Sequence, residues 1–218
     1  MARQSFSERQ VEQRRGEILE AAMSLFETGG LEAVSFRKIA AALGCSYSAP
    51  YRYFPSKDAL LTAMRAQAFR WIERTMLDAI GADGPPRQRL RTLAEAFIRA
   101  GIERPQRYAL MFFRLPEPEG GPRSLELAAA KRDALDVCTR TVAAAQRAGE
   151  LRLAMDPLTA SHLFWAGAHG LVSLQVAGQF VMGRDVDTLV PQMVRTLMQG
   201  MEAPLTDAER ESQQRAVS

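Results

Sequence analysis

The chain has 218 residues, of which 47% are apolar and 24% charged, and its 28 basic and 25 acidic residues give a net charge of +3. This composition excludes an intrinsically disordered chain, because enough apolar side chains are present to form the core of one or two domains. The two cysteines do not suggest a disulfide framework. We expect no export signal and no membrane span, and therefore a cytoplasmic location.

Helical periodicity runs through the whole chain, and no segment alternates apolar and polar residues as a half-buried strand does. The expected fold class is therefore all-α. Residues that commonly cap helices, such as Ser35, Ser56 and Asp156, precede several of the periodic segments. Pro191 lies inside the last segment, where we expect a kink or a late helix start. The expected helices cover residues 9–28, 36–43, 47–53, 57–80, 86–102, a short stretch after Pro105, 124–149, 157–180 and 186–201.

Only Gly44, Cys45 and Ser46 separate the second and third expected helices. Two short helices joined by such a turn are typical of a helix-turn-helix motif, in which the second helix enters the major groove of DNA. The third helix carries hydroxyl, aromatic and guanidinium groups within two turns, and such groups donate to phosphates and read base edges. The candidate DNA-binding residues are Ser35, Arg37, Ser46, Tyr47, Ser48, Tyr51, Arg52, Tyr53 and Lys57.

Lys57 lies in the first turn of the following helix, where its charge opposes the helix dipole. This placement is favourable if a DNA phosphate lies there, because the helix N-terminus and the lysine both attract anions. The alternative for the aromatic residues of this region is that they form a small hydrophobic core, and we expect Phe54 to be a core residue. Further candidates for phosphate or minor-groove contact are the arginines of the N-terminal segment, Arg3, Arg9, Arg14 and Arg15.

The sequence between Ile18 and Leu61 contains a long pattern, carried by residues 21–30, 35–40, 43–46 and 51–54 and by Lys57, Leu60 and Leu61. This pattern resembles the TetR family of bacterial repressors. The resemblance implies an obligate homodimer with one DNA-binding domain per subunit and a divergent C-terminal domain for ligand and dimer contacts. Pro50 departs from the family pattern, which often has leucine there, so the operator sequence cannot be predicted.

These observations predict an N-terminal arm and helix-turn-helix domain over residues 1–57 and a connecting helix over 58–80. A helical ligand-binding and dimerisation domain is expected over 81–203, followed by a polar tail over 204–218. Glycine and proline make residues 81–86 the clearest linker, and residues 116–122 are expected to form a second loop. In the tail, Thr206 and Glu209 match the pattern of a capping box, and the alternative is a frayed or disordered segment.

In the C-terminal region, Trp165, His169 and Gly170 look like the Trp-His-Gly signature of one TetR subclass. Their helix is rich in alanine and glycine, which allow helices to approach closely. In this family the last two large helices pair across a two-fold axis, and we expect the same homodimer contact here, with ordinary intrachain packing as the alternative.

A pocket is expected between the helices of this domain. The candidate residues are aromatic or contain sulfur or imidazole, and the alternative for each is plain core, which is the more frequent role of such residues. No cofactor is expected, and His162 and His169 without a cysteine or carboxylate partner are a poor metal site. The candidate ligand-binding residues are Phe97, Tyr108, Met111, Phe112, Trp165 and His169.

The sequence thus predicts a ligand-responsive transcriptional regulator. It would be a homodimeric repressor that a small, largely apolar effector releases from a palindromic double-stranded DNA operator. The alternative is a ligand-independent dimeric DNA-binding protein. An enzyme is not expected, because the chain has no nucleophile elbow, phosphate-binding glycine loop or metal-ligand cluster. The sequence leaves open the sign of regulation, the effector and the genes controlled.

Overall fold

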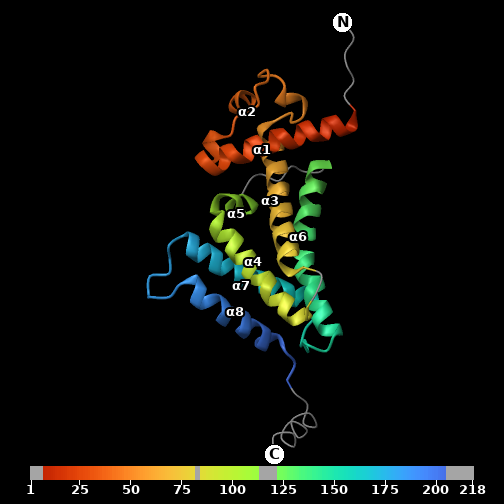
Figure 1. The fold of residues 1–218 in the computed structure, drawn as a ribbon, viewed down its shortest axis with the longest axis vertical. Coiled ribbons are helices and arrows are strands. Elements are labelled where there is room, and N and C mark those ends of the chain that lie inside the picture. The colour runs from red at the N-terminus through yellow and green to blue at the C-terminus, as the bar shows by residue number, and fades with distance from the viewer. Residues whose placement is uncertain (1–6, 82–83, 113–121, 205–218) are drawn as a thin grey trace, which may run out of the picture. The chain divides into compact units, whose positions relative to one another are not determined.

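The computed structural model describes residues 7–81, 84–112 and 122–204 (Figure 1). Within them the protein is helical, and an isolated bridge between Leu153 and Glu202 is the extent of β pairing in this part of the chain. The expected all-α fold is confirmed. The elements are α1 (Glu8–Ala33), α2 (Phe36–Ala42), the 3₁₀ helix η1 (Pro50–Arg52), α3 (Lys57–Ile80), α4 (Pro86–Glu103), α5 (Pro105–Met111), α6 (Pro122–Arg147), α7 (Pro157–Val176) and α8 (Val186–Met201).

Some expectations concern other parts of the chain. Arg3, residues 116–121 of the second expected loop, and the tail with Thr206 and Glu209 lie outside the described residues. Among the described residues, none of the helices combines the length and the apolar character that crossing a bilayer requires.

The chain forms two compact units that are interleaved in sequence. Unit 1 comprises residues 1–74 and 100–134, and unit 2 comprises residues 75–99 and 135–218. Helices α3, α4 and α6 therefore each contribute residues to both units. The predicted domains follow the chain without interleaving, and that functional division stays a prediction.

The end of α1 differs from the expectation that the helix stops at Gly29 and Gly30. Gly30 does adopt the left-handed conformation, with φ of +65°, which glycine adopts without steric cost. Helical structure resumes after this kink and continues to Ala33. The predicted stop is therefore wrong by one short turn, although the glycine that breaks the helix was identified.

In unit 1, α2 forms as the sequence predicts. The Ser35 hydroxyl accepts a hydrogen bond from the Lys38 N–H at 3.3 Å and caps the helix. Phe36 and Ile39 on the expected apolar face are buried, and Phe54 is buried as well, which confirms its predicted core role.

The third expected helix, over 47–53, is not an α-helix. The chain forms turns that end in the single 3₁₀ turn η1, in which the Arg52 N–H donates to the Ala49 carbonyl at 3.2 Å. Pro50 has no N–H to donate to an α-helical ladder, and a tight three-residue turn suits a proline at its start. The expectation of a regular recognition helix is therefore wrong, although the segment lies where it was predicted.

In unit 2, α7 and α8 lie side by side (Figure 1). Asp156 caps α7 by accepting from two backbone N–H groups, as expected of this residue before a proline. The helix ends at Val176, four residues before the predicted end at 180, because Gly178 adopts a φ of +66° that closes the helix.

Helix α8 begins directly after its cap, Asp185, and runs to Met201 with Pro191 inside it. The late start considered for this helix is therefore not found. A Cβ on Gly167 of α7 would lie 2.8 Å from Cδ1 of Leu197 on α8, so the two helices approach closely at this glycine.

Candidate DNA-binding surface and ligand-binding residues

The nine predicted DNA-binding residues all belong to unit 1. They lie around α2, in the segment that contains η1, and at the first residue of α3. Ser35 and Tyr53 are half-buried. The exposed members are Arg37, Ser46, Tyr47, Ser48, Tyr51, Arg52 and Lys57.

An aromatic cluster of Phe36, Tyr47 and Tyr51 organises this surface. The ring of Tyr51 packs on buried Phe36 with centroids 4.2 Å apart, and Tyr47 meets Tyr51 edge-on at 5.6 Å. Tyr47 and Tyr51 remain 58% and 42% exposed. The cluster therefore anchors two phenol groups to the core while leaving their polar edges in solvent.

The hydroxyl groups of Tyr47 and Tyr51 share a hydrogen bond of 3.0 Å. This bond, followed by desolvation, raises the pKa of Tyr51 above its ordinary value. The phenol therefore stays protonated at neutral pH. It can donate to a phosphate oxygen or to a base acceptor.

Lys57 links two elements of unit 1. Its ammonium group donates to the Leu31 carbonyl at 3.4 Å, so it lies near the end of α1 as well as at the start of α3. The side chain is exposed. A lysine ammonium group has three N–H donors, so this one long hydrogen bond leaves the others available to an anion.

Arg15, expected to contact phosphate or the minor groove, is instead engaged inside unit 1. Its guanidinium donates to the Glu126 carboxylate at 3.0 Å and lies 5.0 Å from the ring centroid of Phe54. The side chain is 19% exposed. Arg70 of α3 donates to the other oxygen of Glu126 at 2.8 Å. This α6 carboxylate therefore joins α1 to α3.

A second carboxylate, Glu27, holds the other half of α1 against α5. Arg107 donates to Glu27 at 2.6 Å, and Arg104 lies 3.6 Å from it. The Arg107 guanidinium also lies 5.6 Å from the centroid of the Trp71 ring. The partners are 80 residues apart in the chain, so no local sequence signal indicates the contact.

The six predicted ligand-binding residues fall into two groups. Two residues of α5 and Phe112, which directly follows that helix, belong to unit 1, where the rings of Tyr108 and Phe112 are 5.1 Å apart. The residues of α4 and α7 belong to unit 2. Burial raises the pKa of Tyr108, which therefore stays neutral. The role of all six in ligand binding stays a prediction: Tyr108, Met111 and Phe112 in unit 1, and Phe97, Trp165 and His169 in unit 2.

Partial burial lowers the pKa of His169, whose Nε2 lies 3.3 Å from the Ser173 hydroxyl. The other histidine, His162, places its Nδ1 2.8 Å from the Leu158 carbonyl. In the part of the chain that the structure describes, no three His, Cys, Asp or Glu side chains gather to form a possible metal site.

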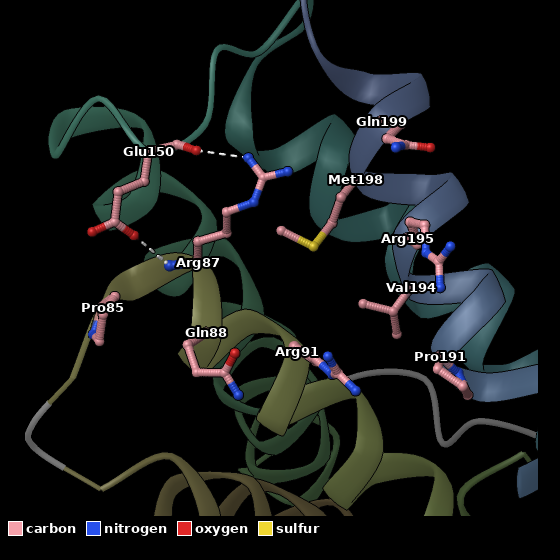
Figure 2. Close-up of a pocket in the computed structure, with 10 residues that line it drawn as sticks. All are labelled: Pro85, Arg87, Gln88, Arg91, Glu150, Pro191, Val194, Arg195, Met198 and Gln199. Atoms are coloured by element: carbon pink, nitrogen blue, oxygen red, sulfur yellow. Dashed lines mark hydrogen bonds between the residues drawn. The ribbon is translucent and has the colours of Figure 1, made fainter.

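Two neighbouring grooves of unit 2 were not anticipated from the sequence, and both are lined mainly by residues of α4 and α8. Figure 2 shows the larger of the two. None of the six predicted ligand-binding residues lines either groove. Charged and polar residues on exposed helix faces gave no sequence signal that distinguishes a groove from an ordinary solvated surface.

Comparisons with known proteins match both parts of the chain. Residues 18–64 match the family model for bacterial regulatory proteins of the tetR family, and residues 90–197 match that for the tetracyclin repressor-like C-terminal domain. The HTH-type transcriptional repressor KstR of Mycolicibacterium smegmatis is 36% identical over 88 residues, which are 40% of this chain and 43% of KstR. The chain thus matches less than half the length of this curated relative.

Solved structures extend the likeness over most of the chain. A Rhodococcus sp. RHA1 protein of unknown function superimposes with a TM-score of 0.74 and 27% identity, over 87% of this chain and 95% of that one. A TetR/AcrR family regulator from Thermobifida fusca gives a TM-score of 0.64 and 25% identity, over 88% of this chain and 100% of that regulator. The narrower Trp-His-Gly subclass stays a prediction. From the two family models and the shared helical fold, the chain belongs to the TetR family of transcriptional regulators, with an N-terminal helix-turn-helix domain and a larger C-terminal helical domain.

Proposed function

We propose that this regulator is a homodimeric repressor that binds a palindromic operator through the surface around Tyr47 and Tyr51 and is released by a small effector. The observation that carries the proposal is the exposed pair of phenols anchored on buried Phe36. Exposed Arg37 and Lys57 in the same unit supply cations for phosphates.

Repression, rather than activation, is proposed because two of the matched relatives, KstR and KstR2, are named repressors. The matched regions cover less than half of each relative's own length, so repression by this chain is a proposal. We further propose that the protein is not an enzyme and that it requires no cofactor.

Dimerisation is proposed to use α7 and α8. Four large apolar side chains of α7 are exposed in the single chain, namely Leu158, Leu163, Leu174 and Val176. Exposed apolar residues along one helix favour an interface, and a two-fold contact uses the same patch on both subunits. A dimer would then present two DNA-binding surfaces to two half-sites, roughly 34–36 Å apart in one turn of DNA.

Release is proposed as a population shift. An effector that binds one conformation better favours that conformation, and α3, which contributes to both units, is the natural lever. Typical coupling free energies of about 1–3 kcal/mol would weaken operator binding by about 5–150-fold. The second candidate function is ligand-independent DNA binding. A screen of small molecules in which no compound changes operator affinity would favour it.

The test is DNA-binding by the full chain to the region that flanks its own gene and to selected genomic fragments, at two salt concentrations. We expect a footprint on a palindrome. Tyr51→Ala and Arg37→Ala should each weaken binding by at least about tenfold. Arg132→Ala, which removes an exposed arginine of α6 in the same unit, is the charge-matched control and should have little effect.

Circular dichroism would verify that each variant is folded. The proposal fails if the folded wild-type protein gives weak, sequence-independent binding with every fragment. It also fails if Tyr51→Ala binds operator as tightly as wild type.

A further inference from the structure

The larger groove of unit 2 has a volume of about 580 Å³ and lies between the first turns of α4 and the second half of α8 (Figure 2). Ligand sites in proteins commonly have volumes of about 300–1,000 Å³, so the groove can accept a small organic molecule. Helix α4 contributes Arg87 and Arg91, and α8 contributes Val194, Arg195 and Met198.

Two arginines supply cationic donors to this groove from opposite helices (Figure 2). Arg195 on α8 is exposed and has no hydrogen-bond or ion-pair partner within the described residues. Arg91 on α4 donates from Nε to Glu95 at 2.9 Å. Because a guanidinium carries five N–H donors, this bond leaves most of the Arg91 fork available.

The lining also contains one carboxylate, that of Glu150. Glu150 accepts a hydrogen bond of 2.7 Å from the Arg87 backbone N–H. The Arg87 guanidinium in turn donates to the Glu150 carbonyl at 2.8 Å (Figure 2). It also donates to the Glu202 carboxylate at 2.6 Å. Arg87 and Glu150 therefore form a fixed end of the groove. Arg195 has no ion-pair partner within the described residues, and Arg91 keeps free N–H donors beside its ion pair with Glu95.

The inner surface of the groove is apolar. Val194 and Met198 are 2% and 6% exposed, and both belong to the lining. The side chains of Gln88 and Gln199 add neutral donors and acceptors at the rim. An apolar floor beside two guanidinium groups suits a molecule with an apolar body and one anionic head.

We propose that this groove binds a small organic anion, with its carboxylate or phosphate between Arg91 and Arg195 and its apolar body against Val194 and Met198. The proposal goes beyond the effector described above, which is largely apolar and was assigned to other residues. The smaller neighbouring groove, of about 210 Å³, shares Arg91 but includes the carboxylates of Glu95 and Asp187. It is therefore less suited to an anion.

Direct binding of three ligands with one naphthalene body would test the charge requirement. Equilibrium dialysis of the full chain, with no DNA present, would measure the affinity of 2-naphthoate, 2-naphthyl phosphate and neutral 2-naphthamide. We expect at least one of the two anions to bind saturably and about tenfold or more tighter than the amide. The preferred anion would identify the head group as a carboxylate or a phosphate.

The location would be tested with Arg195→Gln and Arg91→Gln, each expected to weaken binding of the anion by about tenfold. Arg147→Gln makes the same charge change at an exposed position of unit 2 outside the groove and should bind like wild type. Thermal unfolding would verify that the variants are folded.

Three results would overturn the proposal: no saturable binding of either anion, equal binding of the amide, or unchanged affinity in both groove variants. Because DNA takes no part in the measurement, its outcome does not depend on whether the protein is a repressor.

Discussion

The Glu126 carboxylate of α6 accepts a hydrogen bond of 3.0 Å from Arg15 of α1, which lies 111 residues earlier in the chain. The same carboxylate accepts from Arg70 of α3. One side chain therefore holds two helices of unit 1. These contacts position the helix that precedes the helix-turn-helix motif.

Replacing Glu126 with glutamine removes this charge while preserving its shape. We expect Glu126→Gln to lower the free energy of unfolding by about 1 kcal/mol. The loss is no larger because Arg70 is partly exposed, and solvent screens its ion pair with Glu126. Urea denaturation at low and high salt would measure the change. Asp136→Asn, which breaks the exposed pair with Arg140, should cost less than about 0.5 kcal/mol. Equal losses in the two variants would contradict a special role for Glu126.

The two glycines in the middle of α7 should respond differently to a methyl group. A Cβ on Gly170 meets nothing within 4 Å, so Gly170→Ala should stabilise the protein by about 0.5–1 kcal/mol through helix propensity. A Cβ on Gly167 meets Leu197 and Met193, so Gly167→Ala should lose most of that gain. The larger Gly167→Val should cost about 1–3 kcal/mol.

Thermal unfolding at one fixed protein concentration would compare these glycine variants, because dimerisation makes stability depend on concentration. A greater stability of Gly167→Ala than of Gly170→Ala would contradict the close approach of α7 and α8.

The two cysteines should differ in reactivity. Cys138 is buried, and this burial raises the pKa of its thiol to about 12. Cys45 is partly exposed. A thiol reagent such as dithiobis(nitrobenzoate) at pH 8 should therefore label Cys45 in the native protein and reach Cys138 on unfolding. Cys45→Ser should abolish the fast phase, and a fast phase that persists in this variant would mean that Cys138 is accessible.

Partial burial of His169 makes stability depend on pH. Its pKa in the folded protein is lowered from an ordinary value of about 6.5, so the unfolded chain takes up the proton first as the pH falls. The protein should therefore lose stability as the pH falls below that ordinary value, and regain it as the pH rises. His169→Gln should flatten this dependence in urea denaturation between pH 5 and pH 7.5. The exposed His162→Gln should retain it, and an identical slope in both variants would exclude His169 as the cause.

Local signals in the sequence predicted much of the fold. Ser35 and Asp156 cap the helices they were expected to cap, because capping depends on residues within one turn. The segment at 47–53 was misjudged, since its polar pattern suits a helix but Pro50 limits the backbone bonding. The predicted end of α7 was four residues too late, because the left-handed conformation of Gly178 closes the helix earlier.

The candidate DNA-binding surface was accessible to sequence reasoning because its residues are close together in the chain and match a family pattern. The packing of Tyr51 on Phe36 could not be predicted from the sequence, because the distance between these two rings depends on the conformation of the turn that joins them. The groove beside Arg91 and Arg195 joins helices about a hundred residues apart. No periodicity or spacing in a single sequence indicates that pairing.

The interleaving of unit 1 limits how its DNA-binding part can be exchanged between regulators. A chimera that transplants only residues 1–57 onto a foreign sensor leaves behind the carboxylate partner of Arg15 and the arginine partners of Glu27. The graft would place two charged side chains against a surface that did not evolve with them. Recombination in this lineage is therefore expected to succeed where the crossover carries α5 and the first half of α6 along with the helix-turn-helix.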